Sequence, residues 1–108
     1  MTDPILSPEN CSTMAEVRRG VDALDRELVA LLAVRFGYMR AAARIKPERG
    51  QVRDAARKAA VIAQAVAHAG VVGAPADVVA ALWEQLVEAS IAYELATFDA
   101  RVGAEPSN

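Results

Sequence analysis

The sequence predicts an all-α protein of three helices, of which the first is very long. Apolar residues recur at the spacing of one helix face from residue 14 to residue 46. Proline and glycine then interrupt the chain at two places, and no segment shows the clean alternation of a β-strand. With 108 residues, 54% of them hydrophobic and 24% charged, the chain has the size and composition of one small globular domain.

The first helix is expected to follow a flexible N-terminal tail, residues 1–12. Thr13 is placed to cap the helix, and Glu16 completes a capping box three residues later. The helix should end near Lys46, because Pro47 follows. Its length is about 50 Å, whereas a globule of this size has a diameter of about 34 Å. An apolar stripe of that length needs a second surface, so we expect two copies to intertwine as a homodimer.

The two later helices are marked by aspartate, glycine and proline. Asp54 is predicted to cap a second helix that runs to about His68, with Gly70 as the glycine that stops it. Pro75 and Asp77 open a third helix. Residues 13–100 then form the helical domain, and residues 101–108 a flexible C-terminal tail. The stripe of the third helix ends in polar residues and consists of Val78, Leu82, Leu86, Ser90 and Glu94.

Charge and cysteine content exclude several classes of protein. The formal net charge is −2, and no run of Lys or Arg forms a basic stripe, so we expect binding to neither nucleic acid nor a membrane surface. Cys11 is the only cysteine, which leaves no internal disulfide and no cysteine-based metal cluster. The start of the sequence is acidic, and polar residues interrupt its longest apolar stretch, so we expect neither a secretory signal nor a membrane span. The expected location is the cytoplasm.

Two cations on the first helix indicate a site for an anion. Arg35 lies on the leucine stripe, and Lys46 leaves the same side of the helix about 16 Å further along. A cation on a buried face needs either an internal carboxylate or an anionic ligand, and we favour the ligand. Arg18 lies about 25 Å from Arg35 along the helix axis, so it cannot share a small pocket with Arg35 of its own chain. In an antiparallel dimer, Arg18 of the partner subunit can complete the site.

Blocks of sequence in all three predicted helices carry a family resemblance. The first helix contributes residues 14–18 and 21–25, followed by the leucine pair 31–32, Arg35 and Lys46. Residues 52–57 and 82–94 continue it in the second and third helices, after a lead-in at residues 8–13. Together these blocks resemble the all-helical chorismate mutases, the AroQ class, close to the branch that also holds isochorismate pyruvate lyases. The resemblance extends from about residue 8 to about residue 99.

This resemblance implies a function and a set of site residues. Arg35 and Lys46 would hold a carboxylate and the ether oxygen of chorismate, and Arg18 would reach the other carboxylate from the partner subunit. Lys46, Glu94 and Arg35 would be catalytic. The implied reaction, chorismate to prephenate in aromatic amino acid biosynthesis, is an intramolecular rearrangement that uses no nucleophile, metal or cofactor. The substrate-binding residues implied are Arg18, Arg35, Lys46, Asp54, Arg57, Ser90 and Glu94.

Two residues depart from the commonest family pattern. Bacterial mutases and the lyases most often have Gln at the position of Glu94, whereas some fungal mutases have Glu there, as this chain does. A Glu can donate to an ether oxygen only when it is protonated, so we expect activity to fall as the pH rises. Lys58 stands where mutases commonly have a Glu that binds the ring hydroxyl, and where the lyases have an apolar residue.

Several alternatives remain open at the level of sequence. Isochorismate pyruvate lyase activity, which yields salicylate, is the first, although Glu94 favours the mutase. Lys58 keeps open a mutase for an amino-substituted chorismate. Ser90 and Glu94 could instead form a structural ion pair with Arg35. Outside enzymes, the chain could be a helical dimerisation module in which the arginines are ordinary surface charges.

Overall fold

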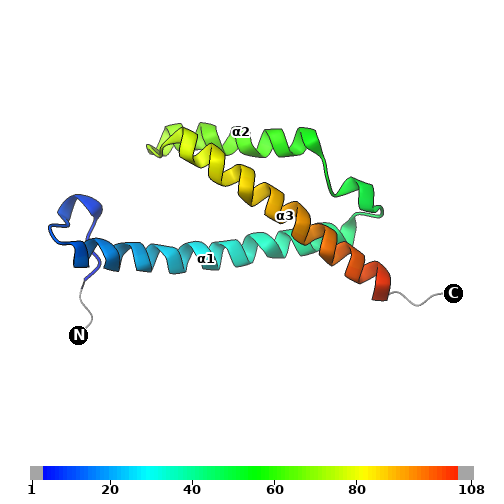
Figure 1. Cartoon of the computed structure of the whole chain (residues 1–108), viewed down its shortest axis with the longest axis horizontal. Helices are drawn as coiled ribbons and strands as arrows, with labels where there is room; N and C mark the ends of the chain where they lie inside the picture. Colours follow the sequence, from blue (N-terminus) through cyan, green and yellow to red (C-terminus); the bar gives the residue numbers. More distant parts are fainter. Residues whose placement is uncertain (1–3, 105–108) are drawn as a thin grey trace. The chain divides into compact units, whose positions relative to one another are not determined.

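The computed structural model describes residues 4–104 and is built from helices (Figure 1). The predicted all-helical class, with three helices and a long first helix, is confirmed. None of the helices that the structure describes is both long and apolar enough to cross a membrane. In chain order the elements are η1 (Pro8–Asn10), α1 (Met14–Ile45), η2 (Arg49–Gln51), α2 (Ala55–Val72) and α3 (Ala76–Ala104), where η marks a 3₁₀ helix.

The start of α1 follows the predicted capping box. The Thr13 hydroxyl accepts a hydrogen bond from the Glu16 backbone N–H at 3.2 Å, and the Glu16 carboxylate accepts from the Thr13 backbone N–H at 3.0 Å. Ser12 adds its own backbone N–H at 3.0 Å. These bonds stabilise the carboxylate and lower the pKa of Glu16, with the Ser12 backbone as the largest cause. A local sequence signal therefore fixes where the long helix begins.

The predicted end of α2 is wrong by several residues. Gly70 lies inside the helix, which continues to Val72, and Gly73 ends it with φ of 79°. A helix stops where a residue adopts the left-handed conformation, and Gly73 does so while its N–H bonds to the Ala69 carbonyl. The predicted cap at the other end is confirmed, because the Asp54 side chain accepts from the Arg57 backbone N–H at 3.0 Å.

The chain divides into two compact units, and α1 contributes to both. The first unit ends at Arg35 and holds the described N-terminal segment with the first two thirds of α1. Most large apolar side chains of this part of α1 are exposed; Leu24, Leu28 and Leu31 are 57%, 55% and 65% exposed. These leucines form an exposed apolar surface on the first unit of the single chain.

The second unit begins at Phe36 and contains the end of α1, the loop with η2, and the helical hairpin of α2 and α3. Its core consists of Val52, Val87 and Ile91, with Trp83 and Leu95 packed against them. The end of α1 joins α3 through the Phe36 and Tyr93 rings, which meet edge to face at 4.9 Å between centroids. Within this unit α3 extends to Ala104, four residues beyond the predicted end of the helical domain.

Candidate active site

Lys46 and Glu94 form the central contact of the candidate site. Lys46 follows the last residue of α1, and its Nζ lies 2.8 Å from the Oε2 of Glu94 on α3. Glu94 is only 4% exposed, whereas the Lys46 side chain keeps 31% of its surface in contact with solvent. An ammonium carries three N–H donors, so the partly accessible Lys46 can donate to a ligand oxygen as well as to Glu94.

Ser90 lies one helical turn before Glu94 and is 3% exposed. Its hydroxyl donates to the Leu86 carbonyl at 2.7 Å, which satisfies the hydroxyl within the helix. The structure thus buries Ser90 and Glu94, the two polar residues at the end of the predicted stripe of α3. The apolar residues at the start of that stripe are exposed in the single chain, Val78 by 50% and Leu82 by 58%.

Asp54 and Arg57 lie together at the start of α2, and both are exposed. The Asp54 side chain caps the helix by accepting the Arg57 backbone N–H. This bond gives Asp54 a structural role that explains its presence without a ligand. The predicted contact of either side chain with a substrate is not tested by this arrangement and stays a prediction.

Arg18 and Arg35 belong to the first unit. Arg18 is exposed on α1, and Arg35 is half-buried. Their predicted convergence with Lys46, from two subunits, stays a prediction. The sequence alternative in which Arg35 pairs with Glu94 also stays open, although Lys46 supplies Glu94 with one cationic partner.

Lys58 enters a second group of charges between α2 and α3, and its partners in that group are exposed more than Lys58 itself. Its Nζ donates to Glu84 at 2.7 Å and to Glu88 at 2.9 Å. Glu88 also accepts two hydrogen bonds from the Arg53 guanidinium, at 2.9 and 3.0 Å. The bonds from Arg53 and then Lys58 lower the pKa of Glu88 to about 2. The same carboxylates raise the pKa of Lys58, with the Glu84 bond as the largest cause.

Arg101 is a site neighbour that sequence reasoning missed. Its guanidinium donates from Nη1 to the Arg44 carbonyl at 2.9 Å and from Nη2 to the Lys46 carbonyl at 3.2 Å. It lies in the segment predicted to be a flexible tail. A signal was present, because Arg101 follows Glu94 by seven residues and two helical turns bring both to the same face of α3.

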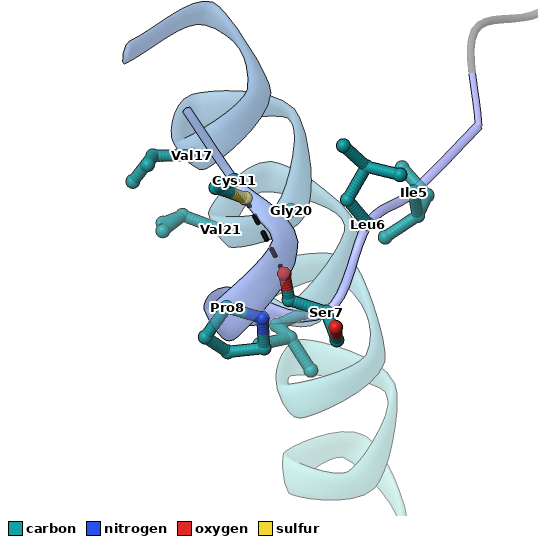
Figure 2. A pocket seen from close by; sticks show the side chains of 9 residues that line it. Ile5, Leu6, Ser7, Pro8, Cys11, Val17, Gly20 and Val21 are labelled. Carbon is teal, nitrogen blue, oxygen red and sulfur yellow. Dashed lines mark hydrogen bonds between the residues drawn. The ribbon is translucent and has the colours of Figure 1, made fainter. Parts of the chain in front are cut away.

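A cavity lies elsewhere, in the first unit. Figure 2 shows the N-terminal segment folded against α1. The Cys11 thiol donates a hydrogen bond to the Ser7 carbonyl, with 3.5 Å between sulfur and oxygen. The cavity measures about 500 Å³, and none of the predicted site residues lines it. Without a charged side chain it does not suit a dicarboxylate. Its lining residues are Ile5, Leu6, Ser7, Pro8, Cys11, Val17, Gly20, Val21 and Leu24.

Comparison with known proteins shows the family to which this chain belongs. The family model described as chorismate mutase type II matches residues 17–95, which span all three helices and include Lys46, Ser90 and Glu94. The chain is also 29% identical to a protein of Pseudomonas aeruginosa named isochorismate pyruvate lyase, over 82% of this chain and 88% of that protein. Because the family model covers well over half of the sequence, this chain belongs to the type II chorismate mutase family.

Proposed function

We propose that this protein is a chorismate mutase, which rearranges chorismate to prephenate. The observation that carries the proposal is the contact of Lys46 with the buried Glu94, at 2.8 Å, in a member of the type II chorismate mutase family. Lys46 directly follows α1 and Glu94 lies on α3, and the resemblance implies that both act on the ether oxygen of the substrate.

The chemistry of the rearrangement fits residues that bind and polarise rather than attack. Within one molecule a C–O bond breaks while a C–C bond forms, so the protein needs to hold the substrate in its compact conformation. Arg18 of the partner subunit and Arg35 bind the two carboxylates in this proposal, and Arg57 adds positive charge. Guanidinium groups suit this role because they bind carboxylates through two parallel hydrogen bonds.

Lys46 and Glu94 act on the oxygen of the breaking bond. Negative charge grows on that oxygen in the transition state, and a donor already in place stabilises it without reorganisation. Lys46 donates as an ammonium, and Glu94 donates when it carries a proton. In the absence of substrate the two groups satisfy each other, which explains how a carboxylate can be 4% exposed.

The proposed assembly is an intertwined homodimer. It is supported by the exposed leucines of α1, since a second copy is a surface of matching length and composition. It also supplies Arg18 from the partner subunit. Mixing two inactive variants tests this directly, because a dimer of an Arg18→Ala chain and an Arg35→Ala chain contains one site with both arginines. With random pairing, about a quarter of wild-type activity should return. No recovery after subunit exchange would mean that Arg18 does not act across the dimer.

Isochorismate pyruvate lyase is the second candidate function. The similarity to the Pseudomonas aeruginosa protein of that name favours it. Glu94 favours the mutase instead. A purified sample should therefore be offered chorismate, with prephenate as the measured product, and isochorismate, with salicylate as the measured product. We expect a higher kcat/KM for chorismate; an amino-substituted chorismate is the third substrate of the series.

Two variants give this assay a matched control. Arg35→Ala should abolish turnover while the dimer stays folded. Arg26→Ala removes an arginine from the opposite face of the same helix, nine residues earlier, and should leave turnover near wild type. If a folded dimer consumed none of the substrates, the helical dimerisation module would replace the enzyme as the better account.

A further inference from the structure

Arg101 is restrained by three contacts at the end of α3. Two of its nitrogens donate to the carbonyls of Arg44 and Lys46, at 2.9 and 3.2 Å. Its guanidinium carbon lies 4.7 Å from the centre of the Phe98 ring, which is itself buried. A planar group with two directed donors and a ring beneath it has little freedom to move.

The two carbonyls are groups that α1 leaves without a helical partner. Arg44 belongs to the last turn of α1, and Lys46 directly follows the helix. The last carbonyls of a helix have no intrahelical donor, so they bond to water or to a side chain. Here one guanidinium from a distant part of the sequence binds both. Arg101 therefore fixes the course of the backbone where α1 ends.

The same face of α3 thus holds Lys46 at two points. Glu94 accepts from the side-chain Nζ of Lys46, and Arg101 donates to the backbone carbonyl of Lys46. The lysine side chain is long and flexible, so its ammonium can occupy many positions unless the backbone and the ammonium are both held. Fixing both ends leaves few ways for the ammonium to approach the oxygen of a ligand.

We propose that Arg101 is a positioning residue that sets the Lys46 ammonium against Glu94 for the breaking C–O bond. This inference rests on the proposed function for its kinetic meaning. It assigns Arg101 no contact with the substrate. Its action passes through the backbone of Lys46, and an error of even 1 Å at a catalytic group can cost about 100-fold in rate.

Arg49 offers a matched control. It lies in the same loop after α1 and binds Asp99 on α3 through two nitrogens, at 2.9 and 3.3 Å. It therefore ties the same loop to the same helix end, and none of these bonds involves an atom of Lys46. If the two arginines only attach the loop to α3, kcat should fall alike in Arg49→Gln and Arg101→Gln. If Arg101 positions Lys46, kcat should fall only in Arg101→Gln.

Steady-state kinetics on the full-length protein make the first test. In Arg101→Gln, kcat should fall by roughly 10- to 100-fold with KM changed by less than about threefold. Arg49→Gln should keep kcat within about twofold of wild type. Arg101→Lys should recover part of the loss, because an ammonium can donate to at least one of the carbonyls. Circular dichroism and Tm confirm that the variants fold. Equal kcat values for Arg49→Gln and Arg101→Gln would overturn the proposal.

A second test needs no turnover. Urea unfolding of wild type, Lys46→Met, Glu94→Gln and the double variant gives the coupling between Lys46 and Glu94. This coupling should fall by about half or more in the Arg101→Gln background and stay unchanged in the Arg49→Gln background. Unchanged coupling in both backgrounds overturns the positioning role. If wild type consumes no substrate, the proposed function fails, and the coupling alone then decides whether Arg101 positions Lys46.

Discussion

Two groups of charged side chains hold α3 in the second unit, and they differ in burial and in number of partners. Glu94 is buried and bound by Lys46, whereas Glu88 is partly exposed and shared by Arg53 and Lys58. Exposed pairs contribute little to stability because water competes for both partners. A buried pair resists solvent and loses much if one member is removed. Glu94 is buried while its partner Lys46 stays partly accessible, so we propose this pair, rather than the cluster around Glu88, as the one that acts on a substrate oxygen.

The largest effect is expected from Lys46→Met. The substitution keeps most of the length of the side chain and removes the donor at the breaking bond, so kcat should fall by about 10²- to 10³-fold. Steady-state kinetics with chorismate measure it, with circular dichroism to verify the fold. Arg53→Met, which breaks two exposed bonds to Glu88, is the comparison and should stay within about threefold of wild type. Similar losses in both variants would remove the distinction between the two charge groups.

Glu94→Gln tests whether the carboxyl proton of Glu94 is needed for the hydrogen bond to the ether oxygen. On the hypothesis that Glu94 acts by donating a hydrogen bond to the ether oxygen, which only its protonated form can do, wild-type kcat should fall as the pH rises. The Gln amide donates at every pH, so the profile of the variant should be flat over the same range. Measurement of kcat from mildly acidic to alkaline pH decides the matter. A variant profile that still follows wild type would assign the dependence to another group.

Local rules allowed much of the fold to be predicted from the sequence. Thr13 with Glu16 and Asp54 with Arg57 act over three residues, so their bonds are visible in the spacing alone. Gly70 shows where such rules fail. A glycine permits the left-handed turn that ends a helix but does not require it, and the turn occurs at Gly73, two residues before Pro75.

The candidate site was predicted unevenly for the same reason. Lys46, Ser90 and Glu94 were expected on one site, and the structure buries Ser90 and Glu94 and pairs Glu94 with Lys46. The sequence pattern puts Arg101 in a tail, because its bonds reach back 55 and 57 residues to carbonyls that any donor side chain could bind. Every residue has a backbone carbonyl, so the sequence does not indicate which carbonyl a distant side chain will bind. Such tertiary capping appears only once the helices are placed.

Lys58→Met tests whether the cluster around Glu88 takes part in recognition of the ring. Glu84 and Glu88 both hold the Lys58 ammonium, so we expect it to stay with them when substrate binds. KM for chorismate should then change by about threefold or less, with kcat unchanged. A rise in KM of about tenfold or more would show that the ammonium leaves its carboxylates for the substrate. The same variant assayed with an amino-substituted chorismate would show whether Lys58 selects the ring substituent.

The smallest expected effect concerns stability in acid and falls on Glu88. Its pKa in the folded protein is about 2, below the ordinary value of 4.5, because Arg53 and Lys58 stabilise its charge. A lowered pKa contributes stability above the unfolded value, and this contribution is lost as the pH falls from about 4.5 towards 2. Glu88→Gln should therefore be slightly less stable than wild type at neutral pH and lose less stability across that interval.

Urea unfolding at pH 7, 5, 4 and about 3 measures this slope. Glu84→Gln is the matched comparison, because it removes one bond to Lys58 and leaves both Arg53 bonds to Glu88 in place. It should keep nearly the wild-type dependence on pH. Identical slopes for wild type and Glu88→Gln would mean that water already screens this carboxylate. The cluster around Glu88 would then contribute nothing measurable to folding, and its contrast with the buried Glu94 carboxylate would be greater still.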